Sequence, residues 1–290
     1  MNSLRKLRLI ALLPVIGATA LLGTAAAAQT AGTDYFSYRA GASFVETPQD
    51  DRLSQMEATP LNLIDDSTTT DWTGDGGEAV FVLELAEETE ISRIAFDTAG
   101  LNRDRKAPKG FTVELSNTSA NSGFEEVLSG TLRMAANGQS FAFKEGERPV
   151  GRWVRLTIHG NYGDDYSGFT GFHGYGRQMT HDASLPNMTG TYDGASGWGW
   201  IHLTQQGNRV TGCYEYERGE ITGTVEGNVL KLDMIQNSSD GRQTHDLGLF
   251  QLTPDGRGIV GLVRGNDRAS RDSYAAYYSA RKTGNLPGGC

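Results

Sequence analysis

The stretch Asn62-Leu63-Ile64-Asp65-Asp66-Ser67-Thr68-Thr69-Thr70-Asp71-Trp72 decides how the first half of the chain is interpreted. It begins with the apolar pair Leu63 and Ile64 and ends at the large aromatic Trp72, and the residues between them are Asp, Ser and Thr. Asp and Thr side chains hydrogen-bond to nearby backbone groups, which favours tight loops over helix interiors and strands. The stretch therefore predicts a loop that is anchored to a hydrophobic core at both ends.

Short apolar runs separated by turn residues surround this loop, and they have the length of strands. The chain holds 38 glycines, and residues 29–290 show no apolar stripe at helical spacing. These features predict an all-β chain. In the first half the expected strands are Tyr35 to Val45 with a break at Ala40-Gly41-Ala42, Ala79 to Leu85, Glu88 to Phe96, Phe111 to Ser116, Phe141 to Phe143, Trp153 to His159 and Gly171 to Gly176.

Five pieces of the first half carry a family resemblance through their order and spacing. They are the Asp/Thr loop with Trp72, F-V-L-E-L at 81–85, K-G-F-T-V-E-L-S at 109–116, R-W-V-R-L at 152–156 and F-H-G-Y-G at 172–176. In this order the pieces resemble the discoidin-like (F5/8 type C, galactose-binding-like) family. The resemblance implies a jelly-roll sandwich of antiparallel strands over residues 35–177.

The resemblance also raises the question of calcium. Many discoidin-like domains hold Ca²⁺ near this loop, with a Glu supplied by the closing strand. Here the closing strand reads Thr170-Gly171-Phe172, without a carboxylate, so Asp65, Asp66 and loop carbonyls would be the remaining oxygen ligands. The alternative, which the missing Glu favours, is a loop stabilised by its own hydrogen bonds.

Two loops have the chemistry of a ligand-binding site. Ligands of the resembled family generally meet loops at one end of the sandwich, and residues 101–106 and 161–166 are candidates for such loops. Sugars need a flat aromatic face and planar polar groups that bond paired hydroxyls. The residues that supply these groups are Asn102, Arg103, Arg105, Tyr162, Asp165 and Tyr166. The alternative is a solvated pair of loops with weak surface ion pairs, and Trp72 and Trp153 are expected in the core.

The second half predicts a smaller domain after a polar linker at 178–186 that ends in Pro186. Strands are expected at 190–193, 198–205, 209–216, 220–226, 230–234, 245–252, 258–263 and 274–281, and residues 284–290 would form a tail. Sequential strands joined by tight turns favour an antiparallel up-and-down β-barrel over 187–283. Its opening, with G-T-Y at 190–192, resembles small lipocalin-like barrels. Its length favours a filled core over a ligand cavity.

The N-terminus and the charge bear on the compartment. Residues 1–28 combine a basic start, an apolar middle and a small-residue end, which is typical of a signal peptide cleaved after Ala28; the alternative is a membrane anchor. The remaining chain would be periplasmic or extracellular, and not membrane-spanning. The net charge of −9, more negative still without the basic leader, argues against nucleic acid or an anionic membrane as partner.

The chain has two cysteines, Cys213 and Cys290. In an oxidising compartment they are expected to form a disulfide that ties the C-terminus to a strand. In the chain-entropy model, closing a loop of this length stabilises the fold by about 4 kcal/mol. The alternative is a free thiol at Cys290 that links to another chain.

No catalytic spacing is present. The five histidines lack metalloprotease spacing, and there is no G-x-S-x-G elbow or C-x-x-C pair. We therefore expect a non-catalytic binding protein that recognises carbohydrate or a surface glycan. The predicted arrangement of this chain, a discoidin-like module followed by a small barrel, also resembles envelope proteins of bacteria. The alternatives are a structural or assembly protein of the envelope that binds another protein, and a carrier of a small apolar ligand in the second barrel.

Overall fold

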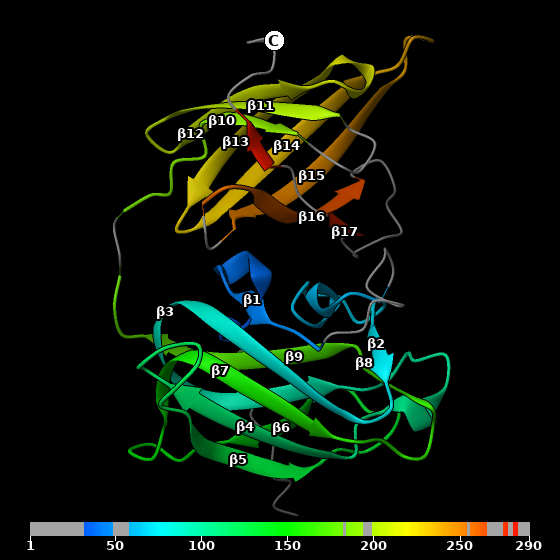
Figure 1. The fold of residues 1–290 in the computed structure, drawn as a ribbon, viewed down its shortest axis with the longest axis vertical. Helices are drawn as coiled ribbons and strands as arrows, with labels where there is room; N and C mark the ends of the chain where they lie inside the picture. Colours follow the sequence, from blue (N-terminus) through cyan, green and yellow to red (C-terminus); the bar gives the residue numbers. More distant parts are fainter. Residues whose placement is uncertain are drawn as a thin grey trace, which may run out of the picture. The chain divides into compact units, whose positions relative to one another are not determined.

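The computed structural model describes residues 32–48, 58–181, 184–193, 199–253, 256–265, 275–277 and 281–283. Every regular element in these residues is a β-strand or a short 3₁₀ turn, and the strands pair antiparallel in sheets (Figure 1). The prediction of an all-β chain is confirmed. No helix among the described residues is long and apolar enough to cross a bilayer. The predicted leader 1–28, the tail 284–290 and Cys290 lie outside the described residues.

The first sheet contains seven strands, ordered β1-β3-β7-β4-β5, with β6 and β9 also paired to β3. The bounds are β1 (Ser43–Glu46), β3 (Glu78–Asp97), β4 (Gly110–Ser116), β5 (Glu125–Thr131), β6 (Gln139–Ala142), β7 (Val150–His159) and β9 (Gly171–Gln178). A separate ribbon pairs β2 (Trp72–Asp75) with β8 (Tyr166–Phe169).

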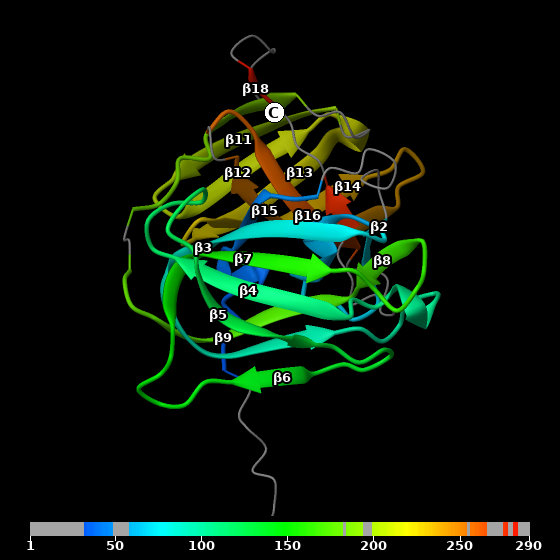
Figure 2. The ribbon, with the colours of Figure 1, turned by 60° about the horizontal axis from the view of Figure 1, so that its bottom comes forward.

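Strand β3 links two layers because it changes neighbours along its length. Residues 78–84 pair with β7 and β1, whereas residues 89–97 pair mainly with β9 and β6, and the register shifts between Glu84 and Thr89. The result is the expected jelly-roll sandwich, and Figure 2 shows β3, β7 and β4 running side by side. The prediction of two separate strands here is wrong, because no Gly or Pro interrupts the chain between Leu85 and Glu88.

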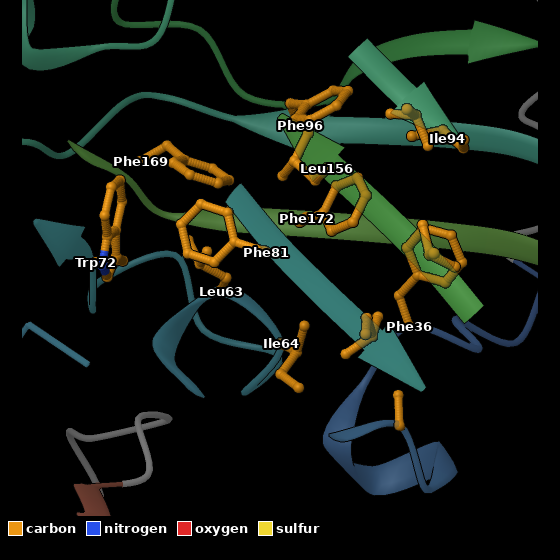
Figure 3. Packing of buried hydrophobic residues seen from close by; sticks show 14 of the residues in the cluster. Phe36, Leu63, Ile64, Trp72, Phe81, Ile94, Phe96, Leu156, Phe169 and Phe172 are labelled. Carbon is orange, nitrogen blue, oxygen red and sulfur yellow. The ribbon is translucent and has the colours of Figure 1, made fainter. Parts of the chain in front are cut away.

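Aromatic and aliphatic side chains fill the space between the layers (Figure 3). The ring of Trp72 meets Phe81 edge-on at 4.8 Å between centroids and lies 5.9 Å from Phe169. Leu63, Ile64 and Trp72 are all buried, so the anchoring predicted for the Asp/Thr loop is confirmed. Trp153 was expected in the core as well, but it is only half-buried.

The N-terminal segment differs from the predicted strand only before the predicted break at 40–42, since β1 follows the break. It forms the 3₁₀ turn η1 (Tyr38–Ala40), and β1 begins only at Ser43. The Ser37 side chain accepts a hydrogen bond from Arg39 N and caps the turn, and Gly41 ends it at φ 97°. A Ser cap followed by a left-handed glycine favours a turn over an extended chain.

The second sheet is a meander of nine strands, from β17 through β16, β15, β14, β13, β12 and β11 to β10 and then β18. The bounds are β10 (Gly190–Asp193), β11 (Trp200–Gln206), β12 (Arg209–Tyr214), β13 (Gly219–Glu226), β14 (Val229–Asn237), β15 (Gln243–Leu252), β16 (Ile259–Gly265), β17 (Ala275–Tyr277) and β18 (Arg281–Thr283). The edge strands β17 and β18 lie so close in sequence that a fully extended chain could separate Tyr277 from Arg281 by at most about 14 Å. The sheet therefore curls until its two edges nearly meet, as expected for an up-and-down barrel.

The inner face of the curled sheet is filled by large side chains, among them Tyr192, Tyr214 and Phe250. Glycines make room for the rings: a Cβ at Gly219 would lie 1.9 Å from the Tyr214 ring, and one at Gly261 would lie 2.5 Å from Phe250. This packing is that of a filled interior. The resemblance to lipocalin-like barrels and the domain boundaries stay predictions.

Strands β14, β15 and β16 bury residues on both of their faces. Alternate residues such as Leu230 and Phe250 point to the inner cluster, whereas Val229, Leu249 and Leu262 belong to the same hydrophobic cluster as the sandwich core. Period-two alternation places successive side chains on opposite faces of a strand. The two sheets therefore share buried apolar surface.

Candidate functional site

Two loops meet at one end of the sandwich. One contains the 3₁₀ turn η3 (Asp104–Lys106), and the other connects β7 to β8 through residues 160–165. Tyr162 N donates to Arg105 O at 3.1 Å, Arg105 Nε donates to Tyr162 O at 3.2 Å, and Lys109 N donates to Gly160 O at 2.9 Å. The structure thus brings together the two segments that the sequence singled out separately.

The second loop holds its shape through Asn161. Its Oδ1 accepts hydrogen bonds from Gly163 N (2.8 Å) and Asp164 N (3.1 Å), and its Nδ2 donates to the carbonyls of Asp164 and Tyr166. Gly163 has φ 92°, and a Cβ there would lie 2.7 Å from a guanidinium nitrogen of Arg105. An Asx-type network with a left-handed glycine makes the loop compact and ordered.

Two of the predicted site residues serve this scaffold. Arg105 bonds the backbone of the opposite loop, and Tyr162 Oη donates to Leu132 O at 2.5 Å. These groups are occupied by contacts within the chain. Their role in the structure is to position the loops.

The other four predicted residues, Asn102, Arg103, Asp165 and Tyr166, are exposed, as is Arg105. The Arg103 Cζ lies 5.5 Å from the centroid of the Tyr166 ring, and Tyr166 is 36% exposed. Asp165 O accepts a hydrogen bond from Gly76 N at 2.9 Å, which fixes this loop against the end of the β2–β8 ribbon. An exposed tyrosine beside a guanidinium can stack on an apolar surface and bond hydroxyls.

Two residues next to this face, Asp164 and Lys106, are not among the predicted site residues. Asp164, whose side chain is only 8% exposed, holds Arg103 through an ion pair of 3.2 Å between Nη2 and Oδ1. Lys106 is buried as a residue, yet its Nζ lies 5.8 Å from the centroid of the Tyr166 ring. The signal that could have found Asp164 is its charge, which is opposite to that of the arginines in the other loop.

The Asp/Thr loop does not fit a calcium site. The Asp65 carboxylate accepts hydrogen bonds from Ser67 N (2.9 Å) and Thr70 Oγ1 (2.7 Å), whereas Asp66 faces Arg39 at 3.3 Å. Burial raises the pKa of Asp65 to about 7, an effect only partly offset by these hydrogen bonds. Among the described residues, no group of three or more His, Cys, Asp or Glu side chains converges to hold a metal. The loop is stabilised by its own hydrogen bonds.

A second polar cluster fastens the N-terminal segment to the sandwich. His173 lies between two carboxylates, with Nδ1 at 2.6 Å from Asp34 and Nε2 at 3.1 Å from Asp97. Burial disfavours the imidazolium, but hydrogen bonds to both carboxylates outweigh it and raise the pKa of His173 to about 10. The protonated ring thus joins residues before η1 to strands β3 and β9.

Comparisons with known proteins match about half of the chain. Three similar solved structures are a family 32 carbohydrate-binding module of AlyQ in complex with 4,5-unsaturated mannuronic acid, a fragment of a putative chitobiase from Bacteroides thetaiotaomicron, and the family 32 carbohydrate-binding module of EndoD from Streptococcus pneumoniae. Their sequence identities to this chain are 20%, 16% and 12%, and their TM-scores are 0.36, 0.44 and 0.40. They cover 46%, 54% and 50% of this chain and 92%, 99% and 100% of their own.

No curated protein matches the chain. Residues 57–178 match the model of the Sad1 / UNC-like C-terminal family. This stretch begins at the Asp/Thr loop, contains both loops of the candidate site and ends with β9, so the match and the observed strands support a discoidin-like fold for this part of the chain.

Proposed function

We propose that this chain is a non-catalytic binding protein that recognises carbohydrate through the face formed by Asn102, Arg103, Asp165 and Tyr166. The observation that carries the proposal is the exposed ring of Tyr166 with Arg103 beside it, at the junction of two ordered loops. A sugar presents an apolar C–H face and a rim of hydroxyls, and this face of the protein offers a partner for each.

The preorganisation of Arg103 supports this role. Its ion pair with the nearly buried Asp164 holds the guanidinium in place before a ligand arrives. Asp164 also accepts a hydrogen bond from Tyr166 N at 3.1 Å, so one carboxylate positions both the cation and the backbone of the aromatic residue. A side chain that is already ordered loses less conformational entropy on binding.

The carboxylate and amide complete the polar rim. Asp165 accepts hydrogen bonds from hydroxyls, and Asn102 both donates and accepts them. We infer a periplasmic or extracellular location from the leader-like residues 1–28, and glycans displayed outside the inner membrane are the corresponding targets.

The test is a glycan array with the protein lacking residues 1–28, followed by calorimetric titration of any sugar that binds. Tyr166→Ala is expected to weaken binding at least about tenfold, which corresponds to about 1.4 kcal/mol. Tyr216→Ala is the matched control, because Tyr216 is also exposed, at 48%, but lies after β12 in the second sheet. Absence of binding to every sugar, or equal losses in the two variants, would refute the proposal.

A further inference from the structure

A cavity of about 600 Å³ lies where the first sheet, the second sheet and the segment between them come together. The sandwich contributes Arg39 from η1, Glu87 from β3 and Arg152 from β7, and the second sheet contributes Lys231 from β14 and the turn at 226–228. Residues 184–186 line a further side. The volume is within the range of about 300–1,000 Å³ that is usual for small-molecule sites.

Specific contacts hold the walls of this cavity in place. Asn228 Nδ2 donates to Gly41 O at 2.8 Å, and the buried Gln251 donates to Ala42 O at 3.0 Å. Tyr38 Oη donates to Val260 O at 2.6 Å. These bonds join the turn at 226–228 and strands β15 and β16 to the N-terminal segment of the sandwich, so the cavity has a defined shape.

The lining carries an excess of positive charge on an acidic chain. Three cations, Arg39, Arg152 and Lys231, line the cavity beside two carboxylates, Glu87 and Glu226, and Lys231 Nζ is paired with Glu226 Oε2. The net charge of the whole chain is −9. Arg39 pairs with Asp66 at 3.3 Å and Arg152 pairs with Glu84 at 3.3 Å, and neither of these two carboxylates lines the cavity.

Both arginine side chains are partly exposed, at 48% for Arg39 and 40% for Arg152. A guanidinium presents a planar fork of donors that matches the two oxygens of a carboxylate or the oxygens of a phosphate. Exposed ion pairs are weak, so a ligand anion can compete with the present partners of the arginines. Few of the lining side chains are apolar, which argues against an apolar ligand.

We propose that this cavity binds a small hydrophilic anion that bears a carboxylate or phosphate group, with Arg39 and Arg152 as its principal ligand-binding residues and Lys231 as a third cation. The cavity shares no residue with the face proposed for carbohydrate, so this inference stands independently of it. Within the chain, Glu226 pairs with Lys231, and Glu87 Oε2 accepts a hydrogen bond from Thr180 Oγ1 at 2.6 Å.

The test is calorimetric titration of the whole chain without residues 1–28, using citrate and inorganic phosphate as probes at about 0.15 M NaCl, where long-range attraction is screened. Saturable binding of one probe is expected, and comparison of the two separates carboxylate from phosphate recognition. Arg39→Gln and Arg152→Gln should each weaken that binding at least about tenfold.

Arg242→Gln is the matched control, because Arg242 pairs with Asp240 on an exposed surface and does not line the cavity. Its affinity for the probe should equal that of the unchanged chain. The melting temperature of each variant shows whether it is folded, and Lys231→Gln replaces either arginine variant that is not. Absence of saturable binding by both probes, or an equal loss in Arg242→Gln, would overturn the proposal.

Discussion

Replacing Asp65 by Asn should stabilise the protein at neutral and alkaline pH. The Asp65 side chain is buried inside the Asp/Thr loop, and burial raises its pKa to about 7 from the ordinary 3.8. An asparagine has the same shape, keeps an oxygen that accepts from Ser67 N, and can donate its amide to Thr70 Oγ1. It removes the charge without removing the loop's hydrogen bonds.

The size and sign of the effect follow from proton linkage. Between pH 3.8 and about 7 the folded chain keeps a proton on Asp65 that the unfolded chain releases, so the stability of the native chain falls as the pH rises through this window. A tenfold change in an ionisation equilibrium corresponds to about 1.4 kcal/mol, so the full fall is about 4 kcal/mol. Asp65→Asn abolishes this fall. The variant should therefore gain little at about pH 4 and several kcal/mol at about pH 8.

The assay is urea denaturation followed by tryptophan fluorescence across this pH range. The quantity to plot is the difference in free energy of unfolding between Asp65→Asn and the unchanged chain, since other titrating groups cancel in that difference. Asp66→Asn is the control, because Asp66 is exposed and its variant should show no comparable rise. If the difference in free energy of unfolding does not change with pH, or falls as the pH rises, then Asp65 ionises in the folded chain without a penalty and the reasoning is refuted.

Three other perturbations follow from the same structure. His173→Gln should lower the stability at about pH 6.5, where the imidazolium bonded to two carboxylates is formed in the folded chain. The difference in urea midpoint between the variant and the unchanged chain should shrink as the pH rises toward 10, because the folded chain then loses its extra proton. A difference independent of pH would contradict this. Gly41→Ala places a Cβ 2.1 Å from Asn228 Oδ1 at φ 97°, so it should lower the melting temperature well beyond Gly207→Ala, where φ is 63° and nothing lies within 4 Å. Reduction of the predicted Cys213–Cys290 bridge should remove about 4 kcal/mol of stability, and a covalent dimer on a non-reducing gel would count against an internal bridge.

The anchored loop and most strands were predictable because each depends on local chemistry. Leu63, Ile64 and Trp72 bracket a run of Asp, Ser and Thr, and the hydrogen-bond preferences of those residues allow few alternatives. Strand β5 was not predicted. Glu125–Thr131 is polar and largely exposed at the edge of its sheet, so its sequence lacks the alternation of apolar and polar residues that a strand with one buried face shows.

The sequence predicted which residues lie at the candidate site, but not which of them position the loops and which stay exposed to a ligand. Sequence reasoning selects Arg105 and Tyr162 for the same chemistry as Arg103 and Tyr166. Only the fold shows that Arg105 bonds the backbone of the opposite loop and that Tyr162 bonds the backbone of Leu132, whereas Tyr166 stays exposed beside Arg103. These differences depend on contacts between residues thirty or more positions apart, and no local pattern encodes them.

The core shared by the two sheets depends on one property of β14, β15 and β16. A strand in a self-contained barrel needs only one apolar face, but here Val229, Leu249 and Leu262 on the outer face are also buried, in one cluster with the sandwich core. Exposing such a patch to water is unfavourable in proportion to its apolar area, so this contact resists separation of the two sheets. Beside it, Arg39 and Lys231 remain at the partly open rim, because charged side chains are costly to bury. Apolar residues thus fix the contact, and charged side chains line the cavity next to it.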